Sequence, residues 1–274
     1  MKNNYKFSAI LPIYRGVNFH TFKKPFESII NQTLKPNELL IIFDGPIKNN
    51  IRKLIEEYQG KYNFIKIINF PSNRGLGYVL NRAVKLCKNK YIARCDADDI
   101  SIPDRFKIQI NYLNKNHKID VLGSNIIELY DNKFFSKKKM PLIHENIINQ
   151  LNFRNPMNHS SVIFKKKKLI QSGNYREMFY FEDYYMWFRM INNGCYFKNM
   201  PDYLVSMNID ENFYNRRKGF KYFKYYLFFL KRLYEDKIIS IFTLFTFSLV
   251  RLPIIFVNIN FVKFIYQKIL RDTL

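Results

Sequence analysis

The sequence predicts an α/β fold built on a mostly parallel sheet with flanking helices. Over residues 1 to about 120, short apolar and β-branched runs alternate with segments of helical spacing. The runs are bounded by turn residues and are apolar throughout, which is typical of parallel strands that are buried on both faces. Strands that alternate with helices in this way are typical of nucleotide-binding sheets.

In this first half the alternation predicts four strands and three helices. The strands are predicted at residues 7–13, 38–43, 64–68 and 91–94. The helices are predicted at residues 19–33, 51–58 and 77–87. Pro25 argues that the first helix proper starts there. Ser101 and Asp104 form a capping-box-like Ser-x-x-Asp with Pro103 in the first turn, which predicts a further helix starting at Ser101.

After Asp120 the pattern is looser and carries fewer turns of the nucleotide-binding type. A strand is predicted at 121–130, a helix at 142–151, a strand at 160–164 and a helix at 182–191. The chain of 274 residues accommodates one large domain or two closely packed halves. We therefore expect the second half to bind a second substrate.

The charge balance is strongly basic, with a formal net charge of +23. This charge predicts attraction to an anionic partner, which could be nucleic acid, a nucleotide ligand or an acidic membrane surface. Part of the charge is compositional, because Lys, Asn, Ile, Phe and Tyr are all abundant, as expected from an AT-rich genome.

Cysteine usage favours a reducing compartment. Cys87, Cys95 and Cys195 are widely spaced and form none of the short pairs that bind zinc or make redox centres. An odd and sparse set fits the cytosol better than a disulfide framework. The N-terminal apolar run is short and lacks a cleavage site, so it is interpreted as the first strand rather than as a signal peptide.

From Gly219 the chain changes character. Lys221, Lys224 and Lys231 fall near one helical face, and Phe, Tyr and Leu occupy the rest. Residues 238–262 are nearly all apolar, but their longest uncharged stretch has 13 residues, whereas a spanning helix needs roughly 20. This pattern predicts a tail that lies at a membrane interface. The alternative is an ordinary apolar helix pair packed on the core.

The segment with the strongest chemical signal is YIARCDADD, where a strand runs directly into Asp96, Asp98 and Asp99. Three carboxylates in four residues repel one another unless a cation or hydrogen-bond donors satisfy them. Oxygen ligands at the carboxyl end of a strand are what Mg²⁺ or Mn²⁺ bound to a diphosphate requires. The alternative role, a helix cap, is weakened because Ser101 already serves as the predicted cap.

Asp44 closes the second predicted strand in IIFDGP. From that position it could reach a nucleotide base or ribose, or it could serve only as a turn residue before Gly45. The residue pattern leaves both roles open.

Residues 73–82, NRGLGYVLNR, form a glycine-containing loop that opens a helix. Gly75 permits close approach of the backbone to a ligand, and Arg74, Arg82 and the more distant Arg94 could neutralise phosphate. The spacing matches neither the dinucleotide fingerprint nor the P-loop. Arg82 could equally be a solvated helix residue.

Glu182 and Asp183 stand at the start of the predicted helix EDYYMWFRM. Acids are common in a first turn because the helix dipole favours them. A group-transfer reaction also needs a carboxylate that takes a proton from an acceptor hydroxyl. The sequence alone does not choose between these roles.

In combination and in order, six segments resemble those of the family 2 glycosyltransferases with a GT-A fold. They are FSAILPIY, SIINQTLKPNELLIIFDGP, NRGLGYVLNRAV, YIARCDADDISIPDRF, NPMNHSSVIF and FEDYYMWFRM, within residues 6 to about 210. The resemblance implies a GT-A type sheet in which residues 1–120 form the nucleotide-sugar-binding half. Residues 121–212 are then the acceptor-binding half of the same domain, and residues 213–274 a basic, aromatic, membrane-associating tail.

The resemblance also implies roles for single residues. Asp44 matches the acid that binds the nucleotide base. Asp96 and Asp98 match the DxD motif for ribose and metal, with Asp99 as an additional metal ligand. Asp183 matches the general base of an inverting transferase. The other positions implied to bind the nucleotide sugar are Pro12, Tyr14, Asn73, Arg74, Gly75, Arg82, Arg94 and Ala97. The positions implied to meet the acceptor or the leaving diphosphate are His159, Glu182, Arg216 and Arg217.

Two departures from the family pattern limit what it implies. Phe43 stands where many relatives carry a second acid, which weakens any inference about nucleotide selectivity. There is no Gln-x-x-Arg-Trp element, since the one tryptophan, Trp187, lies within the predicted EDYYMWFRM helix. Processive synthases use that element, so its absence implies addition of a single sugar.

The implied activity is an inverting transfer of one sugar from a UDP-sugar, assisted by Mn²⁺ or Mg²⁺. The implied acceptor is a saccharide or a polyprenyl-diphosphate-linked saccharide in bacterial capsule, exopolysaccharide, lipopolysaccharide or O-antigen assembly. The implied location is the cytoplasmic face of the cell membrane, with an anionic membrane surface as a partner and no nucleic acid.

Two alternatives stay open at this point. A nucleotidyltransferase would need a GxGxR-type loop near the first strand, where Gly16 stands alone. A non-catalytic basic protein that binds nucleic acid or a membrane would explain the charge, but no nucleic-acid-binding motif occurs in the sequence.

Overall fold

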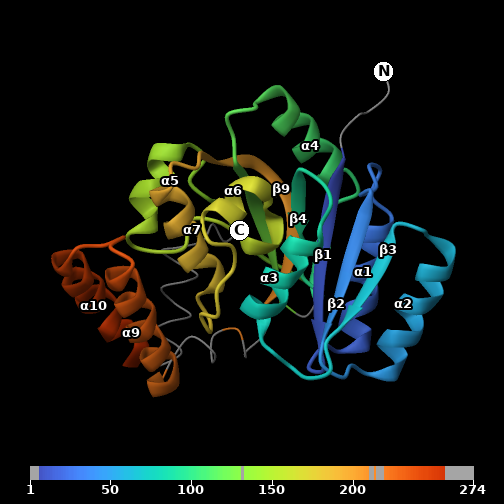
Figure 1. The fold of residues 1–274 in the computed structure, drawn as a ribbon, viewed down its shortest axis with the longest axis horizontal. Helices are drawn as coiled ribbons and strands as arrows, with labels where there is room; N and C mark the ends of the chain where they lie inside the picture. Colours follow the sequence, from blue (N-terminus) through green and yellow to red (C-terminus); the bar gives the residue numbers. More distant parts are fainter. Residues whose placement is uncertain (1–5, 131–132, 210–212, 214–218, 257–274) are drawn as a thin grey trace.

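The computed structural model describes residues 6–130, 133–209, 213 and 219–256. Nine strands form one sheet through the middle of the molecule (Figure 1). They are β1 Phe7–Tyr14, β2 Glu38–Asp44, β3 Ile65–Asn69, β4 Tyr91–Arg94, β5 Asp99–Ser101, β6 Val121–Tyr130, β7 Lys133–Lys138, β8 Ile163–Lys165 and β9 Phe197–Ile209. The helices are α1 Phe19–Ile30, α2 Asn49–Lys61, α3 Leu76–Leu86, α4 Arg105–Lys115, α5 His144–Leu151, α6 Lys166–Gln171, α7 Glu182–Asn192, α9 Gly219–Glu235 and α10 Ile241–Phe256.

The strand order is β3-β2-β1-β4-β8-β6-β9-β5, with β7 paired to β6. The first four of these strands are parallel. The β8 strand runs antiparallel to both β4 and β6, while β6 and β9 are parallel to each other. The sheet is therefore mostly parallel where sequence alternation predicts it, and it becomes mixed in the second half.

Two apolar cores lie on the two faces of the sheet. One packs α1, α2 and α4 against the strands, with Phe22, Ile51 and Phe106 fully buried. The other packs α3, α7 and α9, with Leu80 and Trp187 fully buried. Because both faces of the sheet are covered, its first strands are apolar on both sides, which explains their continuous apolar sequence.

The predicted elements of the first half are confirmed, with two corrections. Pro25 does not start the first helix but lies inside it, because Asn18 is the N-cap and accepts a hydrogen bond from the His20 N–H. Ser101 does not start α4. It belongs to β5, and the helix begins four residues later, at Arg105. The predicted cap at Ser101 is therefore wrong, because the N-cap of α4 is Asp104, and Asp99 has a structural task of its own since it pairs with Met207 of β9.

In the second half of the chain, the sequence pattern predicts fewer strands than the structure contains. Strands β7 and β9 and the short helix α6 were not predicted, and neither was the short strand β5 at the end of the first half. The β9 strand is interrupted by Pro201 and Asp202 and pairs with β6 through register shifts at Asn125, so it lacks a regular apolar alternation. The predicted strand at 160–164 is a 3₁₀ turn, His159–Ser161, followed by β8.

The C-terminal helices form a hairpin at one end of the molecule (Figure 1). The α9 helix packs on α7, with Phe229 stacked on Phe181 and Tyr184. The α10 helix instead exposes Phe242 and Phe245. No helix within the described residues is long and apolar enough to cross a membrane. Three further basic residues of the predicted tail, Lys263, Lys268 and Arg271, lie outside the described residues.

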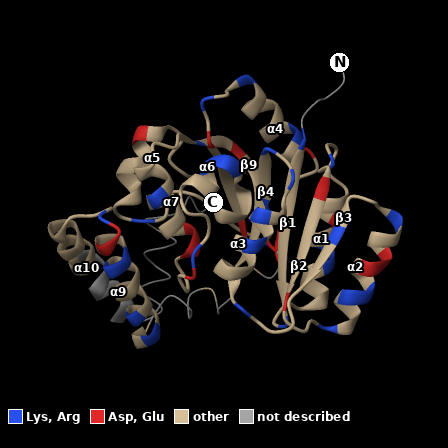
Figure 2. Cartoon of the chain, viewed as in Figure 1, with Lys and Arg blue, Asp and Glu red and all other residues tan. Residues whose placement is uncertain are grey.

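Positive charge is spread over most elements, while α10 carries Arg251 as its one charged residue within Ile241–Phe256 (Figure 2). A groove of about 690 Å³ near the amino end of β4 is lined by six lysines: Lys88, Lys90, Lys165, Lys166, Lys167 and Lys168. The basic character is therefore not a property of the tail alone.

All three cysteines are buried thiols. Burial raises the pKa of each of them, in the case of Cys87 to about 12. Cys95 lies against the Arg105 guanidinium beneath the acidic loop. None of the three forms a disulfide, as the sparse spacing predicts.

One close helix contact yields a test of the fold. A Cβ added at Gly77 in α3 would lie 2.5 Å from the carbonyl oxygen of Arg176, whereas one added at Gly60 in α2 meets nothing within 4 Å. Gly77→Ala should therefore destabilise the protein by about 1–3 kcal/mol. Gly60→Ala should stabilise it by up to about 1 kcal/mol, because alanine favours the helix. Urea denaturation of both variants measures this difference, and equal effects would contradict the close packing.

Candidate active site

The candidate site lies at the edge of the sheet where β1, β2 and β4 end. Because these strands are parallel, their carboxyl ends meet at the same edge (Figure 1). Tyr14 lies opposite Asp44 across β1 and β2, and Arg94 lies opposite Ile10 across β4 and β1. Residues that are far apart in the sequence are thus brought together at this edge.

Asp44 is nearly fully buried and its carboxylate is engaged within the protein. One oxygen accepts the backbone N–H of Arg74 at 2.6 Å, and the other accepts that of Gly75 at 3.1 Å. The side-chain amide of Asn73 lies 3.4 Å from the Asp44 carbonyl. Asp44 therefore fixes the loop that opens α3. This loop is the place where both roles considered for Asp44, contact with a nucleotide and support of a turn, would act.

The three arginines that were considered as phosphate ligands, Arg74, Arg82 and Arg94, lie in different environments. Arg74 is exposed and stacks on the Tyr78 ring, with 4.6 Å between guanidinium and ring centroid. Arg82 is also exposed. Arg94, in contrast, is buried at the end of β4, and only this arginine of the three is built into the acidic segment.

Arg94 donates from one guanidinium nitrogen to the Asp96 carboxylate at 2.5 Å and from the other to the Cys95 carbonyl. Burial by itself lowers the pKa of Arg94, but the charge of Asp96, the hydrogen bond to it and the charges of Tyr175 and Cys95 together outweigh burial and raise the pKa above its ordinary value. Arg94 is therefore a fixed positive charge at the base of the acidic loop. Its Nε atom is buried without a partner.

A second buried arginine, Arg105 of α4, supports this segment from below. It donates to the Arg94 carbonyl at 2.7 Å, to the Ser101 hydroxyl at 3.0 Å and to Gln109 at 3.2 Å. Arg105 was missed as a site residue, although the quoted segment YIARCDADDISIPDRF contains it. An arginine in the first turn of a helix carries no signal that it points back toward a strand end.

The three acids of the DADD segment have different surroundings. Asp98 is exposed and Asp96 is about 31% exposed, whereas Asp99 is nearly fully buried. Burial raises the pKa of Asp99 well above its ordinary value, and the charges of Asp98 and Asp96 add to this effect. Ser160 opposes the rise by donating a hydrogen bond. The backbone of the loop is held by Asn208, whose amide donates to the Asp98 carbonyl at 2.8 Å.

The acidic loop fits a divalent cation that is shared with a ligand. Among the described residues, no group of three or more His, Cys, Asp or Glu side chains is arranged to hold a metal ion by itself. Asp96 and Asp98 offer accessible carboxylates, and their mutual repulsion with Asp99 is the kind that a cation relieves. Mg²⁺ and Mn²⁺ commonly complete such a pair of carboxylates with phosphate oxygens and water.

Asp183, in the first turn of α7, is held in one orientation by two donors. The Asn155 amide donates to one carboxylate oxygen at 2.6 Å, and the Tyr184 N–H donates to the other at 2.8 Å. The Met157 N–H donates to the Asn155 carbonyl oxygen, which turns the Asn155 amide nitrogen toward Asp183. Burial raises the pKa of Asp183 despite these hydrogen bonds.

Asn155 is a further residue that was not singled out from the sequence. It opens the segment NPMNHSSVIF, for which only His159 was chosen. An asparagine before a proline is common in turns, so its residue type alone does not distinguish a turn from a carboxylate ligand.

Glu182 precedes Asp183 and has an even more perturbed carboxyl group. Burial raises the pKa of Glu182 to about 8, the charge of Asp183 adds to the rise, and the charge of Arg94 opposes it. At neutral pH this carboxyl is therefore largely protonated. Burial therefore raises the pKa of both adjacent acids of this first turn.

His159 lies between the two halves of the site. Its Nε2 is 2.7 Å from the Tyr175 hydroxyl, and its ring meets Trp187 edge-on. Burial lowers the pKa of His159 well below its ordinary value, and the charge of Arg94 lowers it further. The ring is therefore neutral at physiological pH.

Arg94 connects these groups electrostatically. Its charge acts on Asp99 of the same segment and on His159, Tyr175 and Glu182, which come from three other segments of the chain. The acidic loop and the start of α7 are thus parts of one site.

The remaining predicted residues are placed as follows. Pro12 and Ala97 are buried beside the carboxyl ends of β1 and β4, and Tyr14 is exposed with its ring folded over Gly16. Arg216 and Arg217 lie outside the described residues.

Comparison with known proteins gives the family. Residues 8–179 match the model of "Glycosyl transferase family 2". The chain is 30% identical over 218 residues to the amylovoran biosynthesis glycosyltransferase AmsE of Erwinia amylovora, covering 80% of this chain and 82% of that protein. It is 30% identical over 275 residues to the UDP-Gal:α-D-GlcNAc-diphosphoundecaprenol β-1,3-galactosyltransferase of Escherichia coli, covering 97% of both.

Among solved structures, the chain resembles S. aureus TarS 1-349 in complex with UDP-GlcNAc. The TM-score is 0.62 at 17% sequence identity, over 83% of this chain and 66% of that one. The chain thus spans just under two thirds of the solved TarS chain. At this identity the likeness concerns the fold alone, and it confirms the predicted GT-A type α/β architecture. On the match to the family model, the chain belongs to glycosyl transferase family 2.

Proposed function

We propose that this glycosyltransferase moves a single sugar from a UDP-sugar to a lipid-linked saccharide, with inversion and with the help of Mn²⁺ or Mg²⁺. The observation that carries the proposal is that the positive charge of Arg94 interacts with the acids of two separate segments. One is the acidic loop, which is suited to a metal and a diphosphate, and the other is the start of α7, whose carboxylates are suited to proton removal. The proposed division of the chain follows: residues 1–120 bind the donor, residues 121–212 the acceptor, and residues 213–274 the membrane.

The donor is proposed to lie across the carboxyl ends of β1, β2 and β4. The names of two similar proteins, one a UDP-Gal transferase and one solved with UDP-GlcNAc, support a UDP-sugar. Asp44 orients the Arg74–Gly75 backbone, and this loop with Pro12, Tyr14 and Asn73 shapes the uridine site. Arg74 and Arg82, both exposed, supply positive charge toward the diphosphate.

A divalent metal is in common use in this family. When bound, it would neutralise the charge that develops on the departing diphosphate. The residues proposed to hold it are Asp98 and Asp96, with Asp99 behind them. Arg94 holds Asp96 in place, so that its carboxylate is oriented before the donor arrives.

Asp183 is proposed as the general base. Its carboxylate takes the proton of an acceptor hydroxyl while that oxygen attacks the anomeric carbon from the side opposite UDP, which inverts the configuration. Asn155 and the Tyr184 N–H keep the carboxylate oriented. Glu182, His159 and the Tyr175 hydroxyl border the acceptor and the leaving diphosphate.

The acceptor is proposed to be a lipid-linked saccharide of bacterial surface polysaccharide synthesis. The names of two relatives support this class: one is an amylovoran biosynthesis glycosyltransferase, and the other is a galactosyltransferase named for a GlcNAc-diphosphoundecaprenol acceptor. The exposed Phe242, Phe245 and Leu249 of α10, with the lysines of α9, support attachment to an anionic membrane surface at its cytoplasmic face.

Removal of one loop carboxylate tests the metal site. Asp98→Ala should lower kcat/KM by about 100-fold or more at fixed Mn²⁺, because charge stabilisation at the diphosphate is lost. Asp202→Ala, an exposed acid on β9, is the matched control and should leave the rate unchanged. UDP release from a panel of UDP-sugars with bacterial lipid extract is the assay. A wild-type rate that is insensitive to EDTA would contradict metal dependence.

Replacement of the proposed base separates chemistry from donor binding. Asp183→Asn should lower kcat by about 10²–10⁴-fold, the range for loss of a general base. UDP affinity, measured calorimetrically with Mn²⁺, should stay within about twofold. Transfer at the wild-type rate would show that another group takes the proton.

The orientation of Asp183 gives a pH prediction. The base is active only when deprotonated, so the rate should fall as the pH drops through its raised pKa. The Asn155 hydrogen bond lowers this pKa, so Asn155→Ala should raise it and move the acid-side decline to higher pH. The ratio of rates at pH 6 and pH 8 should therefore fall in Asn155→Ala. It should stay unchanged in Asn192→Ala, an exposed asparagine at the far end of α7. Equal pH profiles for all three proteins would refute the role of Asn155.

A further inference from the structure

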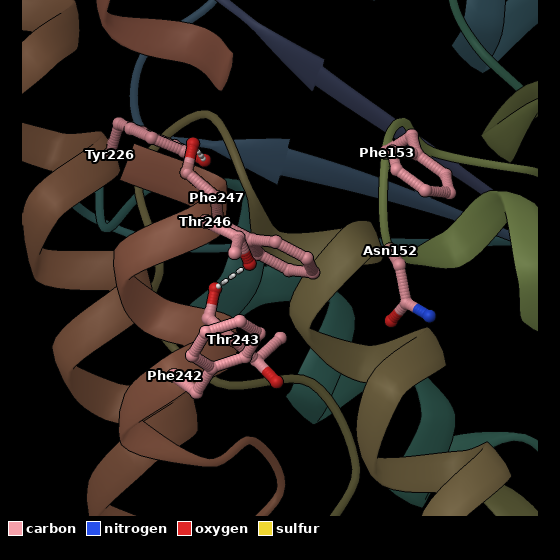
Figure 3. Close-up of a pocket in the computed structure, with 7 residues that line it drawn as sticks. All are labelled: Asn152, Phe153, Tyr226, Phe242, Thr243, Thr246 and Phe247. Atoms are coloured by element: carbon pink, nitrogen blue, oxygen red, sulfur yellow. Dashed lines mark hydrogen bonds between the residues drawn. The ribbon is translucent and has the colours of Figure 1, made fainter. Parts of the chain in front are cut away.

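An apolar pocket of about 240 Å³ lies between the α9–α10 hairpin and the turn that follows α5 (Figure 3). Asn152 and Phe153 form one wall, and α9 and α10 form the other. The residues that line it are Asn152, Phe153, Tyr226, Phe242, Thr243, Thr246 and Phe247. Of these residues, only Phe242 has a role in the proposed function, as part of the exposed apolar surface of α10.

The lining favours an apolar ligand. Four of its seven side chains are aromatic and none is charged. The hydroxyl groups around it are already engaged within the hairpin. Tyr226 donates to the Phe247 carbonyl at 3.0 Å, and Thr246 donates to the Thr243 carbonyl at 2.9 Å (Figure 3). Asn152 supplies the one side-chain amide of this lining, so most hydroxyl groups of a sugar would lack partners here, which is costly.

The size of the pocket fits a short piece of hydrocarbon chain. An apolar cavity of about 150 Å³ holds benzene, with six carbons. In proportion, about 240 Å³ holds about ten carbons, or two isoprene units. The exposed ring of Phe242 at the pocket and the exposed Phe245 and Leu249 beyond it extend the apolar surface outward. A longer chain therefore has apolar surface to follow.

The pocket also lies close to the proposed base. Asn152, in its wall, is three residues from Asn155, which binds Asp183, so their Cα atoms are at most about 11 Å apart. Tyr184, next to Asp183, donates to the carbonyl of Leu151 at the end of α5. The turn that walls the pocket is thus bonded to the first turn of α7 at two points.

We propose that this pocket binds the first isoprene units of the acceptor's polyprenyl chain and thereby sets the distance between the acceptor sugar and Asp183. The proposal rests on the proposed function in that the acceptor is lipid-linked. Arg154 lies in sequence between Phe153 of the pocket and Asn155 of the base site, and carries a positive charge suited to a diphosphate. The order along the chain matches the order of the ligand: isoprenoid, diphosphate, sugar.

The test uses a probe without a sugar, so the identity of the acceptor sugar does not need to be known. Binding of farnesyl diphosphate to the full chain is measured by calorimetry, with inorganic diphosphate as the reference for the headgroup alone. Farnesyl diphosphate should bind at least about tenfold more tightly, because burial of its chain adds to the headgroup contacts. Equal affinity for the two probes would overturn the proposal.

Two phenylalanines on one helix give a matched pair of variants. Phe242 and Phe245 of α10 are 75% and 63% exposed, but only Phe242 lines the pocket. Phe242→Ala should weaken farnesyl diphosphate binding about fivefold to tenfold, whereas Phe245→Ala, which touches only the carbons that extend beyond the pocket, should weaken it by less than about twofold. Thr246→Phe, which fills the pocket, should weaken it further. Equal losses in Phe242→Ala and Phe245→Ala would indicate unspecific contact with the apolar surface and would overturn the proposal.

The same proteins separate this inference from the proposed function. If UDP release with lipid extract is present in wild type but farnesyl diphosphate binding ignores Phe242→Ala and Thr246→Phe, the pocket assignment fails and the transferase proposal stands. If the binding pattern holds but no UDP-sugar yields UDP release with lipid, the pocket assignment stands and the proposed reaction fails.

Discussion

The site depends on one constraint, the burial of the Arg94 guanidinium at the end of β4. A buried cation must be paired and hydrogen-bonded, since the loss of water around it is costly. Asp96 and the Cys95 carbonyl each accept a hydrogen bond from one of its two terminal nitrogens, and this pairing fixes the course of the acidic loop as it leaves the strand. The second buried arginine, Arg105, ties the backbone of the same segment to α4. The loop is thus held from within, while its outer carboxylates stay available to ligands.

The same constraint organises the second half of the site. The Arg94 charge favours the neutral form of His159 and opposes the protonation of Glu182, so the two halves titrate as connected groups. The α7 helix carries these acids at one end and supports the C-terminal hairpin along its side through Tyr184, Phe188 and Phe229. One rigid helix therefore joins the acid groups to the surface that faces the membrane in the proposed function.

Much of the fold is predictable because its first half is built from local signals. Each of the strands β1 to β4 is a short apolar run, and each of the helices α1 to α3 has clear apolar spacing. The second half is less predictable because β9 follows β6 through register shifts, which no periodicity records. The same holds for the site. Asp96, Asp98 and Asp183 stand out as acids at element ends, whereas Arg105 and Asn155 act through contacts across 11 and 28 residues. Asp99 is nearly fully buried, unlike Asp98, and the spacing of the acids in the sequence does not indicate which of them is buried.

The three buried cysteines are natural probes of local unfolding in this protein. A thiol reacts with alkylating reagents as the thiolate, and burial disfavours that form at Cys87, Cys95 and Cys195 alike. Each thiol belongs to a different region: the end of α3, the acidic loop and the turn after α7. Their labelling rates therefore report separately on how often each region exposes itself to solvent, on the scale of local unfolding rather than of catalysis.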